Sequence, residues 1–373
     1  MFRFRSLFAS SPLLTLVTVG CLFFSGCGEK PAAVTEKAPV AKTVYHWKLA
    51  TTWPSNFPIF SSTVDHFAQS VKTMSDGQLL IQVDSANKTK APFGVLDMVH
   101  AGQYQMGHSA SYYWKGTEPS TMFFTTMPFG MTAPEQYAWF YYGGGLALMQ
   151  KVYAKHGVYS FPGGNTGVQM GGWFRKEIKS LKDLKGLKMR VPGFAGEVLA
   201  QLGVVVTNIA PGELYTSLER GNIDALEWVG PALDLKMGFQ KIAPYYYTGW
   251  HEPASELQFL VNRQAFDTLP KNLQEILLTA MKAETLDAYA HMFNDNAAGL
   301  ASLRTEYPEV KVRTFPKEIL DALKQANQRL VDETAAKDPL FKEILDSQRA
   351  YLAVVRPWSI VSDYAYMKDN QEN

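Results

Sequence analysis

The 373-residue sequence contains only two cysteines, Cys21 and Cys27, and both lie near its N-terminus. A disulfide framework and a zinc site built on cysteine thiolates are therefore not expected in the main part of the chain. The sequence also lacks an excess of charge of either sign, because its 36 lysines and arginines are balanced by 35 aspartates and glutamates. This balance excludes the broad basic surface of a nucleic-acid-binding protein.

The motifs of common enzyme classes are also absent. Residues 107–111 approach a nucleophile elbow but lack its second glycine, and residues 143–145 lack the glycine spacing of a dinucleotide site. The seven histidines include no pair at zinc-ligand spacing, and no Walker-type loop occurs. A hydrolase that uses Ser109 and His108 is kept as an alternative, although no acidic partner or oxyanion hole can be placed.

The N-terminus has the pattern of a lipoprotein signal peptide. Two arginines precede an apolar run, and Ser25-Gly26-Cys27 follows it. We predict removal of residues 1–26 and lipidation of Cys27, which would tether the chain to a membrane in the periplasm. Phe24 occupies a position where leucine is usual. A cut before Cys21 would truncate the apolar run, and a retained membrane helix is disfavoured by Pro12 and by its short length.

The remainder alternates strand and helix patterns. Residues 27–43, rich in alanine, proline, lysine and glutamate, predict an extended tether. The fold class is α/β: two lobes of the periplasmic binding protein kind, with a ligand cleft between them and long C-terminal helices. We assign residues 44–165 and 259–300 to lobe 1, and residues 166–258 and 301–373 to lobe 2. Expected strands are residues 45–50, 79–83, 105–109, 187–191, 204–207, 225–229 and 257–262; expected helices include residues 60–74, 96–101, 196–202, 212–220, 273–303, 318–336 and 340–355.

Three residues stand out as candidates for ligand binding. Arg190 ends a predicted strand before a Gly/Pro turn, where its guanidinium would grip a carboxylate in a bidentate manner. Gln169 lies in a glycine-lined segment that a ligand can approach closely. Glu227 lies in an otherwise apolar strand and therefore requires a cation or an arginine partner. A surface ion pair for Arg190 and a satisfied core amide for Gln169 are the structural alternatives.

Five stretches carry a family resemblance: residues 110–116, 163–174, 186–196, 222–231 and 245–253. Over residues 44–366 the chain resembles the periplasmic substrate-binding subunits of tripartite ATP-independent (TRAP) transporters. Within them it is similar to the branch that binds 2-oxo or 2-hydroxy monocarboxylates, such as pyruvate and lactate, together with a metal ion. The resemblance implies that Arg190 holds the substrate carboxylate, that Gln169 and Glu227 give oxygens to the metal, and that Trp228 gives its backbone carbonyl. Further pocket residues would be Tyr112, Asn165 and Phe194.

The choice of metal ion depends on residues 255–260. Glu256 and Gln258 share one face of the expected strand, and we align Gln258 with a position where the family tends to carry glutamate. As metal ligands, a neutral Gln258 favours sodium over calcium, whereas Glu256 would replace the missing charge and reverse that preference.

The sequence therefore predicts a non-enzymatic receptor that captures a small 2-oxo or 2-hydroxy acid and delivers it to a TRAP membrane permease. Closure would bend the chain near Thr166 and Gln258. Helix 340–355 would either form a homodimer or pack on its own lobe. A dicarboxylate or sugar-acid receptor, which would need more basic groups in the cleft, and a ligand sensor without a permease remain as alternatives.

Overall fold

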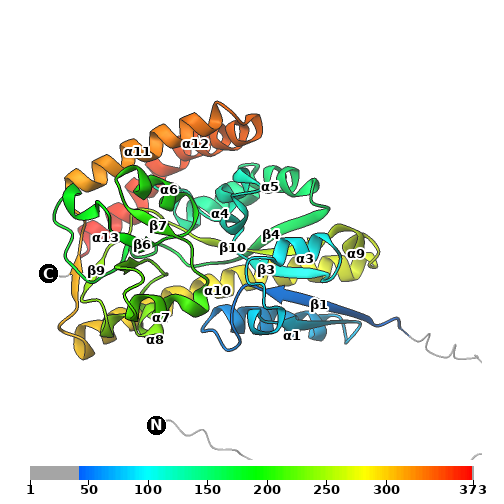
Figure 1. The fold of residues 1–373 in the computed structure, drawn as a ribbon. Helices are drawn as coiled ribbons and strands as arrows, with labels where there is room; N and C mark the ends of the chain where they lie inside the picture. Colours follow the sequence, from blue (N-terminus) through cyan, green and yellow to red (C-terminus); the bar gives the residue numbers. More distant parts are fainter. Residues whose placement is uncertain (1–41, 372–373) are drawn as a thin grey trace, which may run out of the picture. The chain divides into compact units, whose positions relative to one another are not determined.

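The computed structural model describes residues 42–371, and from Thr43 onward they form one compact unit with two β-sheets (Figure 1). The predicted signal peptide, Cys21, Cys27 and residues 27–41 of the predicted tether lie outside the described residues. No helix among those described is both long enough and apolar enough to span a bilayer.

Sheet A has five strands in the order β2-β1-β3-β10-β4. Strand β1 is parallel to β2 and β3, whereas β10 runs antiparallel to β3 and β4. The apolar residues of β1 and β10 pack on α1 and α10, as their alternation predicts. The strands are β1 (Tyr45–Thr51), β2 (Leu79–Asp84), β3 (Met106–Ser109), β4 (Val158–Asn165) and β10 (Glu256–Asn262).

Sheet B has six short strands in the order β11-β9-β5-β8-β6-β7. Strands β6, β7 and β8 are parallel to one another, and β5 runs antiparallel to its neighbours β8 and β9. Strand β6 ends at Arg190, as predicted. The strands are β5 (Gly172–Phe174), β6 (Lys188–Arg190), β7 (Val205–Thr207), β8 (Ala225–Leu226), β9 (Tyr245–Tyr247) and β11 (Lys311–Arg313).

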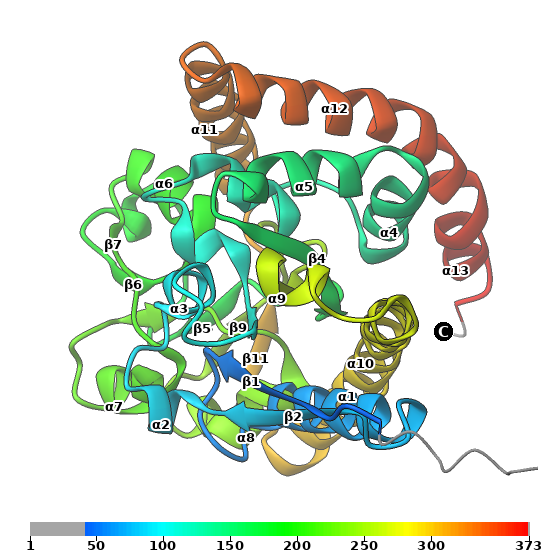
Figure 2. The ribbon, with the colours of Figure 1, turned by 90° about the vertical axis from the view of Figure 1, so that its right-hand side faces the viewer.

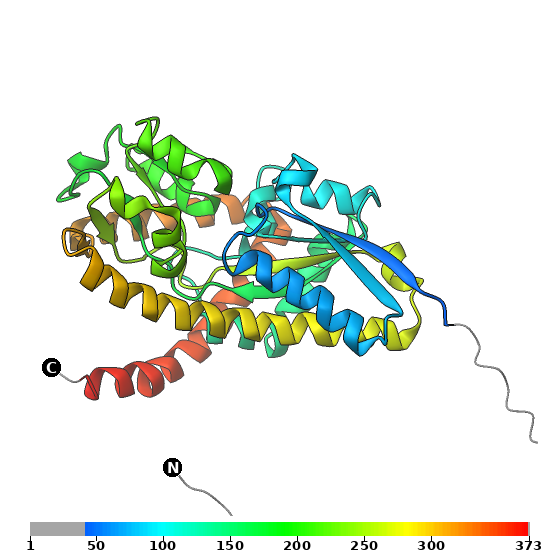
Figure 3. The same cartoon turned by 90° about the horizontal axis from the view of Figure 1, so that it is seen from below.

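The longest helix, α10 (Lys271–Glu306), is a single 36-residue helix that runs beneath both sheets (Figure 3). It packs on α1 and β4 at one end and on α8 at the other. The other helices are α1 (Phe60–Met74), α2 (Ala86–Thr89), α3 (Val95–His100), α4 (Ala133–Tyr142), α5 (Gly145–Ala154), α6 (Gly193–Gln201), α7 (Leu214–Glu219), α8 (Pro231–Met237), α9 (Arg263–Asp267), α11 (Lys317–Ala335), α12 (Pro339–Ser359) and α13 (Ala365–Asp369).

Helix α10 leads from sheet A to sheet B, and two further chain crossings between the sheets lie side by side. One leads from β4 to β5, and the other returns from β9 to β10. The backbone N–H of Thr166 donates to the Ser255 carbonyl at 3.1 Å, and the N–H of Gln169 donates to the Glu252 carbonyl at 2.9 Å. The crossings therefore carry Gln169 and Glu252 as neighbours.

The C-terminal helices divide between the two halves of the fold. Helix α11 packs against α6, beside sheet B, whereas α12 packs on α4 and α5, beside sheet A (Figure 2). Trp139 Nε1 donates to Ser347 Oγ at 3.1 Å, and Arg356 pairs with Glu135 at 2.7 Å. The assignment of residues 301–373 to lobe 2 stays a prediction, although part of the apolar surface of α12 packs on α4 and α5, beside sheet A.

Candidate functional site

The Arg190 side chain is fully buried at the end of β6, next to Glu227, which follows β8. Arg190 Nη1 donates to the Glu227 backbone carbonyl at 2.6 Å and to Glu227 Oε2 at 3.2 Å. The Nε and Nη2 atoms of Arg190 have no hydrogen-bond partner. These two nitrogens form one edge of the guanidinium, which is the geometry that binds a carboxylate in a bidentate manner.

Gln169 is placed by a close backbone approach. A Cβ atom on Gly249 would lie 1.9 Å from the Gln169 carbonyl oxygen, so only glycine fits there. The side-chain amide donates from Nε2 to Thr166 Oγ1 at 2.9 Å, which fixes its orientation. Its Oε1 atom is buried and unpartnered. The amide thus presents a free acceptor oxygen from the first crossing.

Two side chains from the second crossing complete this group, and the sequence reasoning did not propose them. Glu227, His251 and Glu252 are buried and offer ligand atoms that lie within 4.8 Å of one another. His251 Nε2 lies 3.6 Å from Glu227 Oε1. The sequence could have indicated them, because His251 and Glu252 lie within residues 245–253, one of the stretches that carry the family resemblance. Three acidic or imidazole groups brought together in this way can bind a cation.

Burial dominates the electrostatics of this group. It raises the pKa of Glu227 to about 8, although the Arg190 charge lowers it, and it raises the pKa of Glu252 to about 7, with Glu227 adding to the increase. It lowers the pKa of His251 to about 4, so this imidazole is neutral. Two carboxylates and one guanidinium therefore face each other away from water. A bound cation would stabilise both ionised carboxylates.

Unpartnered buried atoms are concentrated here. They are Arg190 Nε and Nη2, Gln169 Oε1, Glu227 Oε1, Glu252 Oε2, Trp228 Nε1 and both ring nitrogens of His251. Buried polar atoms are normally hydrogen-bonded, so such a concentration indicates missing partners. The donors of Arg190 suit an anion, and the oxygens of Gln169, Glu227 and Glu252 suit a hard cation. The residues present therefore fit a carboxylate bound beside a metal ion.

Aromatic side chains from both halves of the fold lie next to this group. The Trp228 ring centroid lies 5.4 Å from Arg190 Cζ and 5.6 Å from the Phe57 ring, with which it makes an edge contact. Tyr112 is near enough that the charges of Glu252 and Arg190 affect its pKa, which burial raises. Its ring lies beside Gly193, and Phe194 is buried one residue further on at the start of α6.

Three predicted site residues lie in other contacts. Gln258 Oε1 accepts from Tyr153 Oη at 2.8 Å and from Ser160 Oγ at 3.2 Å. Glu256 accepts from the N–H groups of Gly163 and Gly164 and, at 2.9 Å, from Asn165 Nδ2. The register of β10 on β4 shifts between Glu256 and Gln258, because three residue steps on β4, from Pro162 to Asn165, oppose two on β10.

Asn165 differs from the expectation in the same way. Its Nδ2 donates to Gln136 and Glu256, and its Oδ1 accepts from the Gly167 N–H. Its amide is thus already bonded within the first crossing. The structure brings together Arg190, Gln169, Glu227 and Trp228, with Tyr112 and Phe194 nearby. Glu252 lies within this group, whereas Glu256 and Gln258 are bonded to residues of β4 and α5.

The alternative hydrolase pair is not arranged for catalysis. His108 Nδ1 accepts from Trp53 Nε1, and its Nε2 contacts the Gly163 carbonyl at 2.9 Å. The Ser109 hydroxyl is bonded to Thr52 Oγ1 at 2.6 Å. Both ring nitrogens of His108 are therefore occupied, and neither can accept the Ser109 proton as a general base requires.

Comparison with known proteins adds a family and close relatives. Residues 49–338 match the family model DctP, described as bacterial extracellular solute-binding protein, family 7. The chain is 43% identical over 323 residues to the monocarboxylate 2-oxoacid-binding periplasmic protein of Nostoc sp., covering 86% of this chain and 87% of the relative.

Two solved structures are also similar. A TRAP periplasmic solute binding protein from Colwellia psychrerythraea, with bound calcium and pyruvate, is 61% identical with a TM-score of 0.87, covering 88% of this chain and 100% of that one. Another from Pseudoalteromonas atlantica, with bound sodium and pyruvate, is 60% identical with the same TM-score and the same coverage.

Proposed function

Because the chain belongs to bacterial extracellular solute-binding protein family 7, we propose that it is a TRAP transporter receptor that captures a small 2-oxo or 2-hydroxy monocarboxylate with a metal ion. The ligand would be of the size of pyruvate or lactate and would pass to a membrane permease. The observation that carries this proposal is the free Nε and Nη2 edge of buried Arg190 beside the unpartnered oxygens of Glu227 and Glu252.

Arg190 binds the ligand carboxylate in this proposal. Its Nη1 remains bonded to Glu227, which holds the guanidinium plane fixed before the ligand arrives. Less side-chain freedom is then lost on binding. The neutral imidazole of His251 offers a further hydrogen-bonding group to the ligand oxygens. Of the side chains gathered here, Arg190 alone carries a permanent positive charge, which favours a monocarboxylate over a dicarboxylate or a sugar acid with a second acidic group.

The metal ion would be held by Gln169 Oε1, Glu227, Glu252 and the Trp228 carbonyl. Its positive charge would compensate the two negative carboxylates, and it would bind the carboxylate and the neighbouring oxygen of the acid. The sequence-based preference for sodium depended on a neutral Gln258. Glu252 contributes a second carboxylate instead, so that argument no longer separates sodium from calcium, and two carboxylates suit calcium well.

Binding would select a closed arrangement of two lobes. Sheet A forms the centre of lobe 1 and sheet B the centre of lobe 2, and we assign α12 to lobe 1 because it packs on α4 and α5. Contacts across the site, such as Phe57 with Trp228 and Lys115 with Glu197, join elements of the two halves. The bend would lie near Thr166 and Ser255, where the crossings meet.

The direct test is to identify the ligand. The purified chain should release a 2-oxo or 2-hydroxy monocarboxylate on denaturation, detectable by mass spectrometry, and calorimetry should show one site for pyruvate. Absence of any carboxylate together with no heat on titration of pyruvate and lactate would contradict the proposal. Hydrolysis of ester or amide substrates at the same site would show that the protein also catalyses a reaction.

We propose further that Cys27 anchors the chain to a membrane. Wild type expressed in a bacterial host is expected in the membrane fraction with a lipid-sized mass increase, and Cys27→Ala is expected to lack that increase. Cys21→Ala is the matched control, because the predicted cut removes Cys21. Recovery of wild type as a soluble periplasmic chain of unmodified mass would contradict the anchor.

A homodimer through the C-terminal helices is the second partner that we propose. Val354, Trp358 and Val361 lie four and three residues apart and are 66% to 76% exposed, and this apolar face continues to Met367. A second copy would cover it. Sedimentation of wild type should show a dimer that Trp358→Ala weakens, whereas Tyr142→Ala, an exposed aromatic elsewhere, should not. A monomeric wild type at high protein concentration would contradict this proposal.

A further inference from the structure

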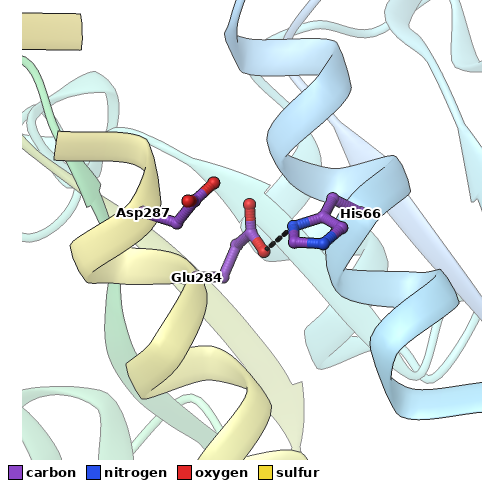
Figure 4. A group of neighbouring side chains, drawn as sticks. All are labelled: His66, Glu284 and Asp287. Atoms are coloured by element: carbon purple, nitrogen blue, oxygen red, sulfur yellow. Dashed lines mark ion pairs between the residues drawn. The ribbon is translucent and has the colours of Figure 1, made fainter. Parts of the chain in front are cut away.

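A second group of metal-ligating side chains lies where α1 packs against α10. His66 comes from α1, while Glu284 and Asp287 lie three residues apart on α10, and the Glu284 carboxylate is placed between the other two (Figure 4). His66 Nδ1 lies 2.8 Å from Glu284 Oε2. One ligand atom from each residue lies within 4.8 Å of the others.

The Glu284 carboxylate is buried without a fixed positive charge. Its side chain is only 4% exposed, whereas that of His66 is 61% exposed. Burial raises the pKa of Glu284 to about 7; His66 lowers it and the charge of Asp287 raises it. Among the described residues, neither Glu284 nor Asp287 forms an ion pair with a lysine or arginine. A buried carboxylate beside a second one normally requires a cation.

A second histidine and carboxylate pair, His291 and Asp295, lies within α10 and differs in its charged neighbours. His291 Nε2 lies 3.5 Å from Asp295 Oδ2, and Lys236 Nζ lies 3.6 Å from the same oxygen. A lysine already compensates that carboxylate, which is also one-quarter exposed. Asp295 therefore has a positively charged partner already, whereas Glu284 would gain one only from a bound cation.

We infer that His66, Glu284 and Asp287 form a binding site for a divalent transition metal ion, for which zinc is the best fit. Imidazole nitrogen and carboxylate oxygen are both donors that zinc binds, the nitrogen favours it over magnesium or calcium, and a water molecule would complete the tetrahedron. Zinc requires about 2.0–2.2 Å to each donor. His66 and Asp287 are exposed, so their side chains are free to rotate inward toward the fixed Glu284 oxygen.

This site differs in its surroundings from the one around Glu227. The three side chains there are all buried and that cation would share its ligands with the bound acid, whereas His66 and Asp287 are exposed to water. Zinc at His66 would link α1, which covers sheet A, to the middle of α10. Binding of the ion to the folded chain alone would stabilise this helix pair.

The test is calorimetric titration of zinc into the full chain saturated with calcium and pyruvate, so that the first site is filled. Wild type is expected to bind one zinc ion. His66→Ala should weaken zinc binding by at least about 10-fold and Asp287→Asn to a smaller extent, because both remove an exposed ligand without disturbing the core. His291→Ala is the matched control and should bind zinc as wild type does. Pyruvate affinity should be unchanged in all three variants.

A second measurement follows the fold. Zinc should raise the melting temperature of wild type and of His291→Ala but not of His66→Ala. No zinc binding to wild type, unchanged zinc binding in His66→Ala, or an equal loss in His291→Ala would each overturn the inference. Displacement of calcium or pyruvate by zinc would show that zinc occupies the first site instead, and would overturn it equally.

Discussion

Arg190→Ala is expected to weaken pyruvate binding by at least about 2 to 4 kcal/mol, which is about 30- to 1000-fold. The substitution removes both free nitrogens that would hold the ligand carboxylate. It also leaves Glu227 buried without the guanidinium that contacts it at 3.2 Å. Calorimetry at saturating calcium measures the loss directly.

Two further variants separate the effect of two parallel hydrogen bonds to the carboxylate from the effect of positive charge alone. Arg190→Lys should recover only part of the affinity, because an ammonium group cannot bind a carboxylate with two parallel hydrogen bonds. Arg313→Ala is the matched control, since Arg313 is an exposed sheet B arginine paired with Glu177. Near-normal affinity in a folded Arg190→Ala protein would remove Arg190 from the site.

Removal of either buried carboxylate should abolish the dependence of acid binding on the metal ion. In wild type treated with chelator in potassium buffer, restored calcium or sodium should tighten pyruvate binding by about 5- to 150-fold, and pyruvate should tighten ion binding by the same factor. In Glu227→Gln and in Glu252→Gln this factor should fall close to one. Each variant retains the shape of the side chain but loses the charge that holds the cation.

Glu256→Gln is the control that tests the assignment of Glu252. Glu256 is as deeply buried, but its carboxylate is bonded to Gly163, Gly164 and Asn165, so its loss should reduce stability and leave the coupling factor intact. Loss of coupling in Glu256→Gln with retention in Glu252→Gln would reverse the assignment. Equal pyruvate affinity with and without added ions would exclude the metal from binding altogether.

Local patterns in the sequence predicted much of the fold because each depends on neighbouring residues. Alternation at residues 45–50 located β1, the apolar run at residues 257–262 located β10, and a pattern that predicted one or two long helices located α10, which is a single helix. Helix α4 was not predicted, although Thr132 and Glu135 form a capping box at its start. Strand β4 was also missed, because its Pro-Gly-Gly end does not resemble a strand and is held by pairing with β10.

The sequence by itself singled out Arg190, Gln169 and Glu227 as candidates for ligand binding, because their local patterns can be recognised, and the family resemblance added Trp228. Only the tertiary structure decided which second carboxylate lies beside Glu227. Glu252 lies in a crossing without regular periodicity, and its place beside Glu227 depends on the hydrogen bond from Gln169 to its carbonyl. Glu256 and Gln258 are bonded instead to residues of β4 and α5, and the sequence could not show this because those partners lie about 90 to 105 residues away along the chain.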